Sequence, residues 1–241
     1  MNKFLIYPVG SSQSCRYAAD FLQKHGANLT DHPTPEITHL LLDVPSFGND
    51  GMLRSGSDLS RILEMLPQYI TVIGGGLEHP ALEGYRRMDL LKDEMYLAKN
   101  AAITAECALQ VAAGSMTTTF AGTPVLVIGW GRIGKCLARL LKALGAHVTV
   151  AARKSADRAM LEALGYKAAD PACIEGSFSV IFNTAPAPVM DCPQGINIDL
   201  ASCRGLAGRD VIWARGLPGI HAPESSGQLI ADTVLRLIRE G

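Results

Sequence analysis

The 241-residue sequence has no apolar run that approaches the roughly 20 residues of a membrane-spanning helix. Residues 1–8 lack the longer apolar region and small-residue cleavage site of a signal peptide, and we expect a first strand there. Lys and Arg total 22 against 23 Asp and Glu, so no overall field favours nucleic acid or an anionic membrane. We therefore expect a cytoplasmic, globular protein that binds neither nucleic acid nor membrane.

The sequence also lacks any Cys-x-x-Cys pair. Its six cysteines, at positions 15, 107, 136, 173, 192 and 203, are scattered through expected helices and loops, which is typical of reduced thiols in a cytoplasm. We accordingly expect no metal site. There is no internal repeat and no low-complexity segment, and the length suits one large or two modest domains.

The most informative segment begins with four apolar residues, 125–128, followed by a glycine-rich turn and a stretch with apolar side chains at helical spacing. Gly129 allows a tight turn, Gly131 lets the backbone approach a pyrophosphate, and Gly134 lets the helix lie close on the strand. N–H groups at the start of the helix attract the phosphate charge. The segment predicts a dinucleotide site whose cofactor-binding residues are Gly129, Trp130, Gly131, Arg132, Ile133 and Gly134.

A second strand, expected at 147–151, lacks the Asp or Glu that usually bonds the adenosine ribose hydroxyl in an NAD-preferring site. Ala152 holds that place, and Arg153, Lys154 and Ser155 follow. Two cations and a hydroxyl donor favour the ribose 2′-phosphate of NADP, which Arg binds as a planar fork and Lys as a point charge. We expect NADP as the cofactor, with NAD as the alternative. A basic turn exposed to solvent would have the same composition.

Alternating strand and helix signals predict an α/β fold. Residues 1–103 are expected to form a smaller, flavodoxin-like parallel α/β substrate domain, with strands at 4–7, 40–44 and 71–74, helices at 16–25, 59–66 and 85–91, and an edge strand at 95–99. A helix from residue 100, with Thr104 as N-cap, joins the domains. Residues 104–222 give the six strands of a doubly wound Rossmann domain, at 125–128, 147–151, 166–168, 179–183, 196–200 and 211–214. Residues 223–241 are expected to form a helix that packs back on the first domain.

Ligands of doubly wound sheets bind beyond the carboxyl ends of the strands. We therefore expect Asn183, Thr184 and Pro186 beside the nicotinamide, and Asp199 opposite them. In the first domain, residues 10–16 form a small polar loop that opens a helix, a backbone geometry that holds a carboxylate. Each of these places also has a plainer interpretation, because Asn, Ser, Gly and Pro end strands for reasons of turn geometry alone.

Several segments, which occur together and in order, resemble the A subunits of dipicolinate synthase. This enzyme of spore-forming bacteria oxidises dihydrodipicolinate to dipicolinate. These segments are 125–155, 181–186, 198–202, 216–220, 222–223 and 227–228. The wider architecture is similar to the D-hydroxyacid dehydrogenases, in which an Ala-Glu helix also bridges the domains, as Thr104 to Glu106 does here. Ser202 and Gly219 stand where those enzymes place their Arg and His. The resemblance therefore does not imply oxidation of a secondary alcohol by a His base.

The resemblance implies an NADP-linked oxidoreductase of sporulation that acts on a small dicarboxylate. Oxidation of a dihydropyridine yields an aromatic ring, so no hydroxyl needs activation, and the protein must position two rings and neutralise two carboxylates. We expect substrate contacts from Ser11, Ser12, Thr104 and Ser202. Glu106 is expected to orient Thr104 or to take a proton, and its alternative is a carboxylate favoured by the helix dipole.

His221 is a second candidate proton carrier, because histidine titrates near neutral pH, and its alternative is a hydrogen-bonded loop residue. The expected partners are a second copy of the chain, in a homodimer, and a flavoprotein B subunit. Two alternatives stay open. One is another NAD(P)-dependent dehydrogenase of a small carboxylic acid, and the other is a non-catalytic nucleotide-sensing or scaffold protein.

Overall fold

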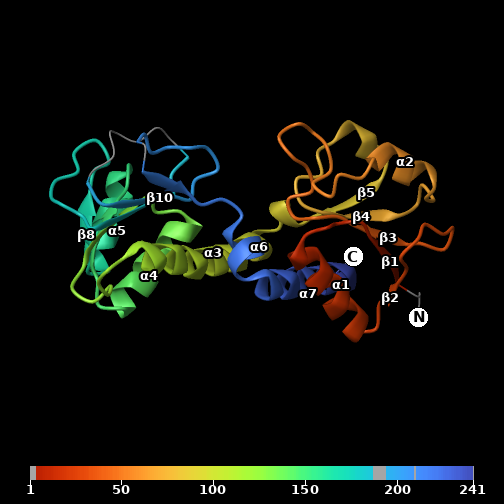
Figure 1. Cartoon of the computed structure of the whole chain (residues 1–241), viewed down its shortest axis with the longest axis horizontal. Coiled ribbons are helices and arrows are strands. Elements are labelled where there is room, and N and C mark those ends of the chain that lie inside the picture. The colour runs from red at the N-terminus through yellow and green to blue at the C-terminus, as the bar shows by residue number, and fades with distance from the viewer. Residues whose placement is uncertain (1–3, 187–193, 209, 241) are drawn as a thin grey trace. The chain divides into compact units, whose positions relative to one another are not determined.

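The computed structural model describes residues 4–186, 194–208 and 210–240, which divide into two compact units (Figure 1). The first unit holds the residues up to Asn100 together with those from Pro218 onward, and the second holds Ala101–Leu217. Helices α3 (Glu94–Ser115) and α6 (Leu217–His221) each run through a boundary. The boundaries therefore fall a few residues before those expected at 104 and 222.

The sheet of the first unit has five parallel strands within the described residues, in the order β2-β1-β3-β4-β5. This is the strand order of flavodoxin-like folds, which confirms the expected smaller parallel α/β domain. The strands are β1 (Leu5–Pro8), β2 (Asn28–Leu29), β3 (His39–Leu41), β4 (Thr71–Gly74) and β5 (Arg86–Asp89). The helices are α1 (Gln13–Lys24), α2 (Leu59–Glu64), η1 (Pro80–Leu82), η2 (Leu90–Lys92) and α7 (Pro223–Glu240).

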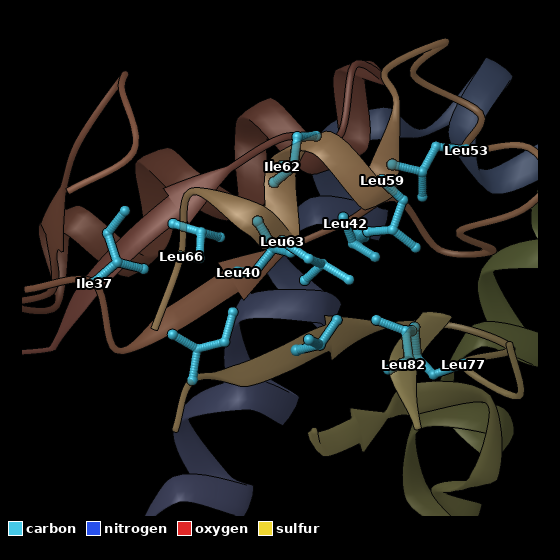
Figure 2. Packing of buried hydrophobic residues seen from close by; sticks show 12 residues of the cluster. Ile37, Leu40, Leu42, Leu53, Leu59, Ile62, Leu63, Leu66, Leu77 and Leu82 are labelled. Carbon is cyan, nitrogen blue, oxygen red and sulfur yellow. The ribbon is translucent and has the colours of Figure 1, made fainter. Parts of the chain in front are cut away.

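A cluster of buried leucine and isoleucine side chains forms the core of the first unit between α2 and the sheet (Figure 2). Leu59, Ile62 and Leu63 share one face of α2, because residues three and four apart lie on the same side of a helix. They cluster with Leu40 of β3 and with Leu42, which directly follows that strand. Full burial of one such side chain stabilises the fold by about 1.5–3 kcal/mol.

The C-terminal helix α7 packs closely on α1 through small residues. A Cβ added at Gly227 would lie 2.5 Å from the Cβ of Tyr17 and 2.7 Å from the carbonyl oxygen of Ser14. On the same helix, Ile230 and Val234 are almost completely buried. The absence of a side chain at Gly227 thus sets the distance between the two helices.

Two expected elements of the first unit are wrong. Residues 85–91, expected as a helix, form β5 and η2, because β5 is a polar edge strand with too few apolar residues to show strand periodicity. Residues 95–99, expected as a strand, are the first turns of α3. Asp93 starts that helix, since its Oδ1 accepts the amide of Tyr96 at 2.7 Å. Thr104, expected as the N-cap, therefore lies inside α3.

The second unit contains the doubly wound sheet. Among the described residues its six parallel strands follow the order β11-β10-β9-β6-β7-β8, which is the Rossmann order 3-2-1-4-5-6 read from the other edge. The strands are β6 (Pro124–Ile128), β7 (His147–Ala151), β8 (Lys167–Ala169), β9 (Val180–Asn183), β10 (Ile196–Asp199) and β11 (Val211–Trp213). Helices α4 (Arg132–Ala143) and α5 (Ser155–Ala163) follow β6 and β7. The predicted Rossmann domain is confirmed.

Candidate dinucleotide-binding cleft

A cleft of about 760 Å³ lies in the second unit, at the carboxyl ends of β6, β7, β8 and β9. In a doubly wound sheet this is the edge at which nucleotides bind. Of the residues predicted to bind the cofactor, those that line this cleft are Gly129, Trp130, Gly131, Arg153, Lys154, Thr184 and Pro186. Arg132, Ile133 and Gly134 form the first turn of α4, and Ser155 begins α5, outside the described lining.

The glycine turn has the geometry that the sequence predicts. Gly129 has φ +104°, a conformation that favours glycine, and a Cβ there would lie 2.6 Å from Thr184 Oγ1. A Cβ at Gly134 would collide with the carbonyl oxygen of Gly129, so this glycine lets α4 start against the turn. Gly131 is the N-cap of α4, and a Cβ there would meet nothing within 4 Å. An anion at this helix end would therefore approach backbone N–H groups directly.

Asn183 and Thr184 shape the wall of the cleft through contacts within the protein. Asn183 is fully buried, and its Nδ2 donates to Asp199 Oδ1 at 3.0 Å and to the Ala185 carbonyl at 3.2 Å. Its Oδ1 accepts the Ala185 amide at 3.1 Å. The Thr184 hydroxyl donates to the Ile128 carbonyl at 2.9 Å and so joins the ends of β9 and β6. The sequence places Asn183 and Thr184 against the nicotinamide, whereas these contacts give both side chains a structural role.

Asp199 is a fully buried carboxylate at the end of β10 that holds the loop after it. Its Oδ1 accepts hydrogen bonds from Asn183 Nδ2 and the Ala201 amide, both at 3.0 Å. Its Oδ2 accepts the amides of Gly205 at 2.7 Å and Leu206 at 2.9 Å. Four donors engage this carboxylate, which thereby fixes residues 200–206.

The end of the cleft expected to hold the adenosine ribose carries both cations and carboxylates. Arg153 and Lys154 are exposed and line it, and so do Asp157 and Asp170. Asp170 Oδ2 forms an ion pair with Arg158 Nη1 at 3.0 Å. Sequence reasoning missed both carboxylates. Asp157 lies in the first turn of α5, where acidic residues are favoured, and Asp170 follows β8, whose packing beside β7 only the sheet order reveals.

In the first unit, the polar loop at residues 10–12 does bind a carboxylate, and that carboxylate is Asp43. The amides of Ser11 and Ser12 each donate to Asp43 at 3.0 Å, and the Ser12 hydroxyl donates to it at 2.5 Å. Burial, together with the charge of Asp43, raises the pKa of the neighbouring Cys15 thiol to about 12. A side chain of the protein itself therefore engages both amides and the Ser12 hydroxyl of this loop.

A similar arrangement occurs at the end of β5. Asp89 accepts the amides of Gly76 at 2.9 Å, Leu77 at 2.8 Å and Leu91 at 3.0 Å. Asp43, Asp89 and Asp199 thus each stand at or just beyond the carboxyl end of a strand and hold a neighbouring loop by its backbone N–H groups.

The remaining expected residues are divided between the units. Thr104 is buried within α3, Glu106 is exposed on the same helix, and Ser202 is exposed in the loop held by Asp199, all in the second unit. His221 is exposed at the end of α6 in the first unit. Within the part of the chain that the structure describes, no group of three or more His, Cys, Asp or Glu side chains is placed to hold a metal ion. No helix among the described residues is long and apolar enough to cross a membrane.

Residues 84–189 match the family described as D-isomer specific 2-hydroxyacid dehydrogenase, NAD binding domain. Together with the doubly wound sheet and its cleft, this match defines the chain as an NAD(P)-dependent oxidoreductase with a nicotinamide dinucleotide cofactor. Among curated proteins, the chain is similar to the A subunit of dipicolinate synthase from Bacillus subtilis (strain 168). The two are 26% identical over 242 residues, which cover 88% of this chain and 82% of the relative.

Solved structures show the same likeness in fold. The structure of the dipicolinate synthase A subunit from Bacillus halodurans superposes with a TM-score of 0.82 at 21% identity, covering 100% of this chain and 99% of that one. The structure of D-lactate dehydrogenase from Salmonella superposes with a TM-score of 0.57 at 15% identity, covering 98% and 97%. The resemblance to both groups, predicted from the sequence, is confirmed.

Proposed function

We propose that this protein is the NADP-linked subunit of a dipicolinate synthase, which oxidises dihydrodipicolinate to dipicolinate in sporulation. The observation that carries the coenzyme assignment is the cleft beyond the Rossmann strands. Its glycine turn suits a diphosphate, and Arg153 and Lys154 directly follow Ala152, which stands where an NAD-preferring site usually carries an acidic residue. The similarity to the A subunit of a dipicolinate synthase over most of the chain supports the choice of substrate.

The proposed reaction needs little acid–base catalysis from the protein. The dihydropyridine ring loses a hydride and a proton, and the aromatic product supplies the driving force. A bound nicotinamide coenzyme would supply the hydride acceptor. Backbone N–H groups at the start of α4 hold the diphosphate, while Arg153 and Lys154 bind the 2′-phosphate. We assign the proton to Glu106, with His221 as the alternative, because both side chains are exposed.

For the substrate carboxylates we favour Ser202 among the four residues expected from the sequence. It is exposed on a loop that Asp199 holds in place, so its hydroxyl is presented from a fixed backbone. Ser12 is a weaker choice, because its hydroxyl already donates to Asp43 and accepts the Cys15 amide at 3.2 Å. Ser11 has its amide on Asp43, and Thr104 is buried.

Arg153→Ala tests the coenzyme assignment. Loss of a charged hydrogen bond costs about 1.5–3 kcal/mol, so affinity for NADP should fall roughly 10- to 150-fold while affinity for NAD stays unchanged. The matched control is Arg139→Ala, which removes the same charge from an exposed position on α4 outside the cleft lining. Equal losses for NADP and NAD, or the same loss in the control, would refute the role of Arg153.

Turnover tests the reaction. Purified protein, combined with the flavoprotein partner that we propose for it, should form NADPH from enzymatically generated dihydrodipicolinate. Absence of turnover with either nicotinamide coenzyme would reject the reaction, and tight NADPH binding without turnover would instead favour a nucleotide-sensing role. Size-exclusion chromatography with light scattering tests the proposed homodimer separately.

A second candidate function is oxidation of a different small carboxylic acid. The match of residues 84–189 to the 2-hydroxyacid dehydrogenase domain favours it. A screen of small 2-hydroxy and 2-amino acids with both coenzymes separates the two functions, because only this candidate predicts turnover in that screen.

A further inference from the structure

A guanidinium inside the second unit fastens the turn that carries Arg153 and Lys154. Arg158, in α5, directs its Nη1 back to the end of β7, where it donates to the Ala152 carbonyl at 2.8 Å and the Arg153 carbonyl at 2.7 Å. The same nitrogen lies 3.0 Å from Asp170 Oδ2. The Arg158 side chain is only 26% exposed, so this contact is partly shielded from water.

The contact fixes the backbone from both sides. Ala152 is almost fully buried, and its amide donates to the Ala169 carbonyl of β8 at 3.0 Å while its carbonyl accepts from Arg158. Asp170 is itself held, because its Oδ1 accepts the Ala172 amide at 3.0 Å. With two successive carbonyls bound to one guanidinium, the direction in which the chain presents residues 153 and 154 is set before any ligand arrives.

The contact also decides the charge of the cleft. Asp170 lines the cleft, and Arg158 neutralises it, so Arg153 and Lys154 outweigh the remaining carboxylate, Asp157. Without Arg158, two carboxylates would face the same space as the two exposed cations. Their repulsion would act on a 2′-phosphate and far less on a 2′-hydroxyl, since only the phosphate is charged.

We propose that Arg158, paired with Asp170, determines the coenzyme preference of this protein from outside the cleft lining. Arg158 is a positioning residue that aims Arg153 and Lys154 at the 2′-phosphate of NADP and cancels the charge of Asp170. This inference rests on the NADP assignment of the proposed function and adds to it the residues that make the assignment work.

The test is isothermal titration calorimetry of the full chain with NADP and with NAD. Arg158→Ala should weaken NADP binding about tenfold and leave NAD binding within about threefold of the wild type, so the preference falls. Asp170→Asn keeps the guanidinium on both carbonyls and removes a negative charge, so NADP binding should stay equal or tighten. The double variant should recover part of the NADP affinity that Arg158→Ala loses. Arg139→Ala again serves as the control.

The outcomes separate the two proposals. If the wild type binds NAD as tightly as NADP, the coenzyme assignment fails and this inference falls with it. If the wild type prefers NADP and Arg158→Ala keeps that preference, or weakens both coenzymes equally, the inference alone is overturned. Should Arg158→Ala not fold, Arg158→Gln keeps a side-chain N–H donor but loses the charge that neutralises Asp170. It should then show a smaller NADP-specific loss, and an unchanged preference would likewise overturn the inference.

Discussion

Replacement of Asp199 by Asn changes one atom of a fully buried side chain that four donors engage. The wild-type carboxylate accepts from Asn183 and the Ala201 amide on one oxygen and from the Gly205 and Leu206 amides on the other. An asparagine offers one carbonyl oxygen and one NH₂ group, so it can accept on one side only. Whichever way it turns, two N–H donors face an NH₂ group that also donates.

The magnitude follows from those two lost hydrogen bonds. At roughly 1.5–3 kcal/mol for each bond to a charged group, the second unit should lose about 3–6 kcal/mol of its free energy of unfolding. Small domains have about 5–15 kcal/mol in total, so the loss is a large part of the stability. The effect should concentrate in the loop from Ala201 to Leu206, which these bonds tie to the end of β10.

The assay is urea denaturation of the Asp199→Asn variant, combined with hydrogen exchange of the peptides that cover the loop. We expect a lower unfolding midpoint and faster exchange at the amides of Gly205 and Leu206. The matched control is Asp210→Asn, the same chemical change at an exposed position shortly before β11. If both variants unfold at the wild-type midpoint and the loop amides keep their protection, the carboxylate does not hold the loop and the argument is refuted.

Three further predictions concern the glycine turn, a half-buried histidine and the packing of α7. Gly134→Ala should abolish dinucleotide binding and lower the melting temperature, because its Cβ would meet the backbone of the turn. Gly131→Ala should keep the wild-type melting temperature, because its Cβ would enter open space. Thermal melts with and without NADP distinguish the two variants. Burial lowers the pKa of His39 from 6.5 to about 4, so the unfolded chain takes up a proton that the folded chain refuses, and stability should fall as the pH drops from about 6.5 toward 4. His39→Phe should flatten that dependence in melts across the same range, and an unchanged slope would contradict it. Gly227→Leu should lower the free energy of unfolding by about 1–3 kcal/mol, because the new side chain would force α7 away from Tyr17. Urea denaturation measures this loss, and a wild-type midpoint would show that the two helices are not closely packed.

What the sequence could predict is what short segments determine. The turn from Gly129 to Gly134 follows from neighbouring residues, and the strand at 147–151 has the bounds that the structure gives. The parallel α/β class of both units follows from the alternation of strands and helices. In contrast, 85–91 and 95–99 are short and of mixed polarity, so their pattern could not decide between helix and strand.

The residues of the candidate site likewise fall into those that the sequence could predict and those that it could not. Arg153 and Lys154 were accessible to sequence reasoning, because they follow a strand end directly. The partner of the Ser12 loop was not, since Asp43 is 31 residues away and only the pairing of β1 with β3 brings it near. Arg158 and Asp170 were missed for the same reason, as their meeting depends on β8 lying beside β7.

The three aspartates at the strand ends affect the entropy cost of binding a ligand. Asp43, Asp89 and Asp199 keep their loops in shape with charges that belong to the chain, so no incoming molecule has to order them. Association therefore escapes much of the entropy cost that loop folding would add, and affinity is set by the groups left over on the surface. Such a scaffold can change the ligand that it accepts by altering a few exposed side chains while its backbone stays intact.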